Sequence, residues 1–386
     1  MSTVVVSGAL ANRPDNGGGA SVRMTWVSAL RRLGFDVWFF EQIDRSLLGA
    51  EPGEGGAPEE SRPARYFRSV TERHGLAERR VLLDERGASV FGPDRQALEG
   101  VAAEAALLVN LSGHLTVPWL FERFARKAYV DLDPGFTQFW HAEGVQGARL
   151  AGHDGYFTVG LNIGQPGCPI PVDGIAWSPL PPPVVLDEWP VEEGDLDAFT
   201  TVASWRGSYG GVDHRGRHYG SKAHEFRKFI ELPQRLPIPV QIALDIHPAD
   251  EGDRVALREH GWELVDPGEV AAEPESYRRY LAGSGAELSV AQGIYVETAS
   301  GWISDRTVRY LASGRPVLVQ DTGFSDHYPV GRGLLAFRTV EEAVTGAESI
   351  AGAYDAHRLW ARYLAEEFFD SDRVVGRLLE ELEAAR

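Results

Sequence analysis

A predicted helix beginning near residue 305 has a first turn that would suit a bound anion. Residues 301–319 read GWISDRTVRYLASGRPVLV, in which Ser304 is a good N-cap and Arg306 falls in the first helical turn. A cation in that turn opposes the helix dipole at a cost of roughly 0.3–1 kcal/mol. An anion bound at the helix N-terminus would reverse the sign of that cost. The alternative is that Arg306 is solvated or paired with Asp305.

The same combination of residues recurs in the stretch GRHYGSKAHEF, at 216–226. Ser221 is the expected N-cap, and Lys222 stands in the first turn. Two helix starts that each carry a cation where carboxylates are preferred predict a diphosphate held between them. The alternative is that Lys222 is solvated or forms an ordinary surface ion pair with Glu225, which contributes little to stability.

Polar side chains also follow two predicted strands in the first half of the chain. ALLVNLSG (106–113) is followed by His114, and KAYVDLDPG (127–135) contains Asp131 and Asp133. Ligands of open α/β sheets collect at the carboxyl ends of the strands, so we expect these residues near a binding site. The two aspartates, spaced by two, would face the same side of a strand, but we predict no metal there.

The elements that must hold these residues alternate strand and helix twice. A strand at 3–10, a glycine-rich loop at 11–21, a helix with apolar residues at helical spacing and a strand at DVWFFEQ form one βαβ unit. A second alternation starts at 199–207. Between the two, residues 164–190 hold eight prolines and can be neither helix nor central strand. The pattern predicts an α/β protein with two parallel sheets.

Composition narrows the class of protein further. A chain of 386 residues suggests two domains. A formal net charge of −18 argues against a nucleic-acid partner and against docking on an anionic membrane. The single cysteine, Cys168, excludes an internal disulfide and fits a reducing compartment. The sequence shows neither a signal peptide nor a stretch long enough for a transmembrane segment, so we expect a cytoplasmic protein.

Three stretches resemble those of GT-B glycosyltransferases. RYLASGRPVLV at 309–319 is similar to the family's E-A-x-A-x-G-x-P-V-V helix and strand. GRHYGSK at 216–222 is similar to the G-R-x4-K stretch that holds the donor diphosphate, with Arg217 and Lys222 at its two basic positions. The early glycine loop, Gly17 to Gly19, resembles the family's N-terminal loop facing the reacting centre.

The resemblance implies two Rossmann-like domains facing across a cleft. It places an acceptor-side domain at 1–190, a nucleotide-sugar domain at 191–355, and terminal helices at 356–386 that cross back to the first domain. One feature departs from retaining members of the family. Where they have two glutamates, this chain has Gly301 and Arg309, and Asp305 or Glu297 would have to replace them.

The implied activity is transfer of a sugar from a nucleoside-diphosphate donor to a hydroxyl of a small molecule or glycan, without a metal or a permanently bound cofactor. The donor nucleotide would be UDP, TDP or GDP. Cations at helix N-termini would stabilise the charge on the leaving diphosphate. The residues expected to hold the donor are Gly17, Gly18, Ser204, Trp205, Arg217, Lys222, Ser300, Ser304, Arg306 and Thr307.

An inverting transfer also needs a general base on the acceptor hydroxyl. The first candidate is Asp15, in the glycine loop, followed by His114 and Asp133. For Asp15 the competing interpretation is an Asx-turn residue in the sequence DNGGG. For His114 it is a histidine at the end of a strand whose hydrogen bonds are satisfied within the protein.

Three other functions fit parts of the same pattern. A sugar-nucleotide epimerase would share the architecture and need acidic and histidine residues in the cleft. A dinucleotide-dependent oxidoreductase is disfavoured because NGGGAS lacks the G-x-G-x-x-G spacing. A non-catalytic sugar-binding or scaffold protein that keeps the fold is the third, and the two missing glutamates favour it.

Overall fold

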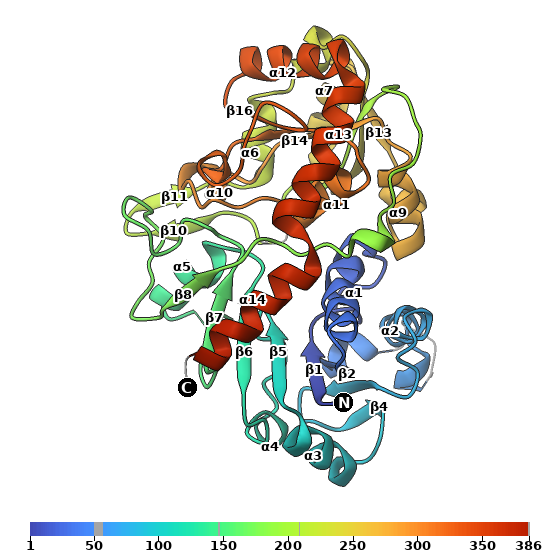
Figure 1. Ribbon diagram of the computed structural model, residues 1–386, viewed down its shortest axis with the longest axis vertical. Helices are drawn as coiled ribbons and strands as arrows, with labels where there is room; N and C mark the ends of the chain where they lie inside the picture. Colours follow the sequence, from blue (N-terminus) through green and yellow to red (C-terminus); the bar gives the residue numbers. More distant parts are fainter. Residues whose placement is uncertain (50–56, 146, 208, 385–386) are drawn as a thin grey trace.

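Two parallel sheets, one in each half of the chain, form the framework of the molecule (Figure 1). The computed structural model describes residues 1–49, 57–145, 147–207 and 209–384. The first sheet has the order β4-β3-β2-β1-β5-β6-β7-β8, and every neighbouring pair is parallel except β3 with β4. Its strands are β1 (Thr3–Ser7), β2 (Asp36–Ile43), β3 (Arg80–Asp84), β4 (Ser89–Phe91), β5 (Leu107–Leu111), β6 (Lys127–Asp131), β7 (Gly155–Thr158) and β8 (Trp177–Pro179).

The centre of the first sheet is β1, whose three valines are completely buried. Branched side chains favour a pleated strand covered on both faces. After it the chain enters α1, where the Asn16 side chain caps the helix by accepting a bond from Gly19 N at 2.7 Å. The helices of this half are α1 (Gly17–Arg32), α2 (Arg62–Arg73), α3 (Arg95–Glu104), α4 (Pro118–Phe121) and α5 (Phe136–Ala142).

The second sheet has the order β13-β12-β9-β14-β15-β16 and is parallel throughout. Its strands are β9 (Phe199–Ser204), β12 (Val240–Asp245), β13 (Trp262–Val265), β14 (Ala286–Ser289), β15 (Val317–Gln320) and β16 (Leu334–Phe337). Helices cover both of its faces. They are α6 (Lys222–Arg227), α7 (Glu251–Glu259), α8 (Pro267–Val270), α9 (Pro274–Ala282), α10 (Gly293–Glu297), α11 (Asp305–Ala312), α12 (Val340–Gly352) and α13 (Tyr354–Leu364).

The helix predicted after Ser304 forms as expected. The Ser304 hydroxyl accepts a bond from Arg306 N at 3.2 Å, and Gly314, with φ +66°, follows the last turn in the left-handed conformation. The hydrophobic residues of α11, among them Val308 and Leu311, are fully buried. The predicted start and end of this helix are therefore confirmed.

The last helix runs from the second half of the chain to the first. α13 packs beside α11, and a π-helical turn at Ala365–Phe369 leads into α14 (Ser371–Ala384). α14 then lies along α1 and buries Val374 and Leu378 in the hydrophobic core of the first sheet. Figure 1 shows this helix, in red, passing from the upper sheet to the lower one. Within the described ranges, no helix is long and apolar enough to cross a bilayer.

The start of α1 contacts the backbone of the second half directly. Gly17 N donates to Ala271 O at 2.8 Å. A Cβ atom at Gly17 would lie 2.4 Å from Glu273 O and 2.8 Å from Ala271 O. Only glycine lets two backbones approach this closely. Gly17 is therefore a packing position between the two halves and lies outside the cavities described below, which corrects its expected role in holding the donor.

Replacing Gly17 by alanine is expected to lower the free energy of unfolding by about 1–3 kcal/mol, because backbone atoms must move to admit the methyl group. Denaturant or thermal unfolding would measure the loss. The matched control is Gly100→Ala in α3, where a Cβ would meet nothing within 4 Å. That change should leave stability equal or raise it by about 0.5–1 kcal/mol. Equal effects at the two positions would contradict the close approach.

Candidate functional site

A cleft of about 690 Å³ opens between the carboxyl ends of the two sheets. We call it the main cleft. It is bordered by the loop before α1, by Asp133 beyond β6, by Ser204 at the end of β9 and by the first turn of α11. A smaller space of about 180 Å³, the inner chamber, adjoins it on the side of the first sheet. The two cavities share part of their lining, including Arg13, Arg23, Asp133, Trp302 and Asp305. The predicted meeting of polar residues at the strand ends is therefore seen in both halves.

Lys222 is buried at the wall of the main cleft, with 8% of its surface exposed. Within the part of the chain that the structure describes, its ammonium group makes no hydrogen bond or ion pair. Burial, with a smaller contribution from the nearby charge of Arg306, lowers the pKa of Lys222 from 10.5 to about 7. This is a cation that a bound anion would stabilise.

Arg306 lines the same cleft but is already paired. Its guanidinium donates to the Glu287 carboxylate at 2.6 Å, to Val202 O at 2.7 Å and to the Ser289 hydroxyl at 2.6 Å. The partner is thus neither solvent nor Asp305. Glu287 is fully buried, so the pair is close to neutral and Arg306 acts chiefly as a dipole at the cleft wall.

Asp131 and Asp133, two residues apart, have different surroundings. The Asp131 carboxylate accepts bonds from Thr137 Oγ1 at 2.7 Å, Gln138 Nε2 at 2.8 Å and Thr158 Oγ1 at 2.7 Å, and so holds the turn between β6 and α5. Asp133 faces both cavities. Burial, and then the charge of Asp131, raise the pKa of Asp133 to about 6. At neutral pH Asp133 is an ionised base with an affinity for protons near that of imidazole.

The other two candidates for the base are differently placed. His114 lines the inner chamber, where burial, then Arg23, lower its pKa to about 3, so it is neutral at any physiological pH. Asp15 borders the main cleft with a φ of +58° and forms an ion pair with Arg62. The left-handed backbone suits a turn residue, but the Asx turn itself is not formed, since Gly17 N donates to Ala271 O and the Asp15 carboxylate pairs with Arg62.

The structure brings three more of the predicted donor residues to the main cleft. Gly18 faces the ring of Tyr277, Ser204 ends β9, and Ser304 caps α11. The capping hydroxyl and the free N–H groups of the first turn of α11 point to the same wall that Lys222 lines.

Trp205, Ser300 and Thr307 lie outside both cavities. The Trp205 ring is buried in the core of the second sheet, with its indole N–H on Asp253 at 2.8 Å. Ser300 is completely buried, and its hydroxyl accepts a bond from Trp302 N. Thr307 is buried on the inner side of α11. These three expected donor contacts are corrected, because the three side chains are buried within the protein and do not line the main cleft.

Arg217 does not reach the cleft either. It lies in a two-stranded hairpin, β10 (Val212–His214) with β11 (Arg217–Tyr219), that packs against α5 of the first half. Its guanidinium lies over the Tyr219 ring and contacts Glu297 at 3.3 Å, with about half of the side chain exposed. The predicted arginine of the diphosphate site is therefore a residue of the hairpin surface.

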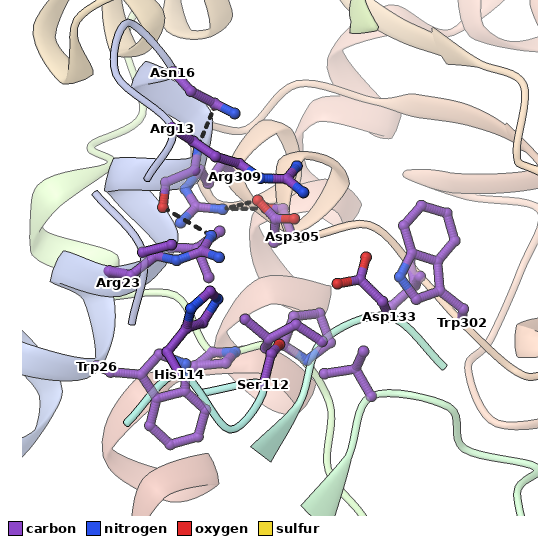
Figure 2. A pocket seen from close by; sticks show the side chains of 18 of the residues that line it. Arg13, Asn16, Arg23, Trp26, Ser112, His114, Asp133, Trp302, Asp305 and Arg309 are labelled. Carbon is purple, nitrogen blue, oxygen red and sulfur yellow. Dashed lines mark hydrogen bonds and ion pairs between the residues drawn. The ribbon is translucent and has the colours of Figure 1, made fainter. Parts of the chain in front are cut away.

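Sequence reasoning missed the residues that form the inner chamber. Arg13, Arg23 and Trp302 line it, and Arg309 reaches it from α11 (Figure 2). One signal was available, because Arg23 is three residues before Trp26 and seven before Leu30, on the buried face of α1. A charged residue on an apolar helix face usually marks a site.

In the described ranges, no group of three or more His, Cys, Asp or Glu side chains is arranged to hold a metal ion. In the first half, hydrogen bonds from neighbouring residues occupy Asp131. The groups that line the main cleft are cations, the N–H groups of a helix start, and the carboxylates of Asp15, Asp133, Asp245, Asp266 and Asp305.

Comparison with known proteins gives a fold but no sequence relative. No family model and no curated protein matches the sequence. Among solved structures, an α-glucosyltransferase in complex with UDP and a DNA 13-mer superposes with a TM-score of 0.59 at 8% identity, over 99% of this chain and 100% of that one. Anabaena HepE with UDP and glucose gives 0.57 at 11%. Sucrose-phosphate synthase from Thermosynechococcus elongatus gives 0.57 at 13%. In both comparisons the match covers 100% of this chain and 100% of the other.

These comparisons correct one inference from composition. The net charge of −18 argues against a nucleic-acid partner, yet a protein of this same fold is solved with DNA. The exclusion is wrong, because total charge does not describe the potential of the single face or cleft that meets a ligand.

The architecture itself matches in full. Two α/β sheets face each other across a cleft, and two of the structures that match over the whole chain, an α-glucosyltransferase and HepE, are solved with UDP. The chain has the GT-B fold of nucleotide-sugar glycosyltransferases.

Proposed function

We propose that this protein transfers a sugar from a nucleoside-diphosphate donor to a hydroxyl group of an acceptor. The observation that supports the proposal most strongly is Lys222. A buried ammonium group with no hydrogen-bond partner among the described residues lines the same cleft wall as the N-terminus of α11. The ammonium group and the N-terminus of the helix both attract negative charge, so together they suit a diphosphate.

The donor diphosphate would lie between Lys222, Ser304 and the first turn of α11. As the bond to the sugar breaks, negative charge develops on the diphosphate, and the ammonium and N–H groups stabilise it. The cleft continues past Tyr277 to the start of α8, at Asp266, Pro267 and Gly268, which leaves room for the nucleoside. Two neighbours of the fold, the α-glucosyltransferase and HepE, are solved with UDP, which supports UDP over TDP and GDP.

We assign the proton acceptor on the acceptor hydroxyl to Asp133 in place of Asp15. Asp133 stands where the main cleft meets the inner chamber, is ionised at neutral pH, and makes no ion pair within the described ranges. Asp15 is held by Arg62. The assignment places the donor on the second half of the chain, about 191–355, and the acceptor on the first, about 1–190.

A panel of UDP-, TDP- and GDP-sugars tests the proposal. We expect one donor to release its nucleotide slowly in the absence of an acceptor, and calorimetry to show binding of the matching diphosphate. Addition of EDTA should leave both unchanged, since the proposed site uses cationic side chains. Binding of a diphosphate without any turnover would instead identify a sugar-binding protein, and absence of binding would overturn the proposal.

Binding of UDP should also take up a proton. Because the pKa of Lys222 is about 7 in the unliganded protein and a bound diphosphate favours the charged form, about one proton is absorbed per UDP at pH 8. Affinity should therefore fall by up to about tenfold per pH unit above pH 7. Calorimetry in buffers of different ionisation enthalpy measures the uptake. The Lys222→Met variant should lose it, and uptake by that variant would assign the proton to another group.

A further inference from the structure

The inner chamber holds more positive than negative charge. Arg13, Arg23 and Arg309 line it together with the carboxylates of Asp133 and Asp305 (Figure 2). Arg309 and Asp305 form an ion pair at 2.7 Å and offset one another. Arg13 lies over the Tyr209 ring, and Arg23 shares the chamber with the carboxylate of Asp133.

Arg23 is the least compensated of these charges. One terminal nitrogen donates to Gly19 O at 3.1 Å, while Nε is buried without a hydrogen-bond partner. Within the described ranges no carboxylate lies within ion-pair distance of its guanidinium. Burial lowers the pKa of Arg23. Arg23 is half-buried, with its Nε fully enclosed. A cation enclosed without a paired anion is unfavourable unless a ligand supplies the counter-charge.

The positive charge of the arginines also acts on the neighbouring His114. Besides burial, the charges of Arg23, Arg149 and Arg13 keep His114 neutral by lowering its pKa. His114 therefore adds no charge of its own. A guanidinium offers a planar fork of N–H groups that matches a carboxylate, sulfate or phosphate, whereas a neutral sugar needs no such charge.

We propose that the inner chamber binds a negatively charged group carried by the acceptor substrate, with Arg23 as its principal partner. This inference rests on the proposed function and narrows the acceptor to molecules that carry a negatively charged group. The chamber is formed largely by the first half of the chain, from α1 and the loops after β5 and β6. An acceptor anchored there by its anion would present a hydroxyl to Asp133 at the junction with the main cleft. The negative group is thus on the acceptor and not on the transferred sugar.

The test uses the full chain saturated with UDP, so that the diphosphate site is occupied. Inorganic phosphate and glucose 6-phosphate are the probes, glucose is the neutral comparison, and thermal unfolding is the readout. We expect both anions to raise Tm where glucose does not. In Arg23→Gln this increment should vanish. The control Arg32→Gln lies on the same helix and removes the same charge from an exposed ion pair with Asp187 and Asp372; its increment should stay. Equal increments in all three proteins would overturn the proposal.

Two further measurements separate the alternatives. Without anions, Arg23→Gln should unfold at the same or a higher temperature than the wild type, since it removes an unpaired charge; a large decrease would show that Arg23 is structural, and would overturn the proposal. UDP-glucuronate and UDP-glucose should bind equally well. A preference of about tenfold or more for UDP-glucuronate that Arg23→Gln abolishes would place the anion on the donor sugar and overturn the acceptor assignment. Failure of UDP itself to bind would refute the proposed function instead.

Discussion

Replacing Asp133 by asparagine is expected to lower the turnover of a nucleotide-sugar with its acceptor by about 10²- to 10⁴-fold. The amide keeps the size of the side chain but cannot accept the proton of the acceptor hydroxyl. In the wild type the rate should rise with pH through about pH 6, as the Asp133 carboxyl ionises, and then level off. The variant should lose this rise, while its affinity for UDP stays within about twofold.

The comparison variant is Asp15→Asn, at the residue that the sequence alone favoured. It removes the ion pair with Arg62 at the exposed entrance of the main cleft. An effect on turnover much smaller than that of Asp133→Asn is expected, because an exposed ion pair contributes at most about 1 kcal/mol. If instead Asp15→Asn abolishes turnover and Asp133→Asn does not, the two roles are reversed.

Replacing Lys222 by methionine is expected to weaken UDP binding by about 1.5–3 kcal/mol, or roughly 10- to 150-fold. The methionine fills a similar volume but supplies no charge to the diphosphate. Titration calorimetry with UDP measures the loss. Lys228→Met is the control, since Lys228 follows the same helix, lies outside the main cleft, and has an exposed ammonium group paired with the buried carboxylate of Glu225. A comparable loss in both variants would show that total charge, and not a contact at Lys222, attracts the nucleotide.

The same substitution should change how stability depends on pH. The pKa of Lys222 is about 7 in the folded protein against 10.5 as its ordinary value, so between these pH values the unfolded chain binds the additional proton. The free energy of unfolding of the wild type should therefore rise with pH across this range. In Lys222→Met that contribution is absent. The unliganded variant should be at least as stable as the wild type at pH 7.

Local signals in the sequence predicted the elements well. Branched residues marked β1, and a serine and a glycine marked the two ends of α11. These features act within a few residues of one another, so they can be seen in a single stretch. Lys222 and Asp133 were predicted as site residues on similar grounds, as a cation in a first turn and a carboxylate at a strand end, and both line the main cleft.

Features that depend on pairing between distant residues escaped the sequence. The partner of Arg306 is Glu287, which the parallel sheet brings to it from β14. GRHYGSK was interpreted as a loop that holds phosphate, but half of it forms a hairpin strand whose position is set by packing on α5. The place of Arg23 in a cavity could not be predicted, because the cavity forms only when residues from both halves of the chain surround it. Sequence spacing fixes which face a residue is on, but not what lies opposite that face.

The crossing of α14 also bears on how the protein is made. The hydrophobic core of the first sheet includes Val374, Val375, Leu378 and Leu382, which leave the ribosome after the whole second sheet. At synthesis rates of about 5–20 residues per second, roughly 10–40 s separate the end of β8 from the arrival of α14. During that interval the apolar groove on α1 is uncovered. The N-terminal half therefore cannot complete its core as it emerges, and its apolar groove stays exposed until α14 is made.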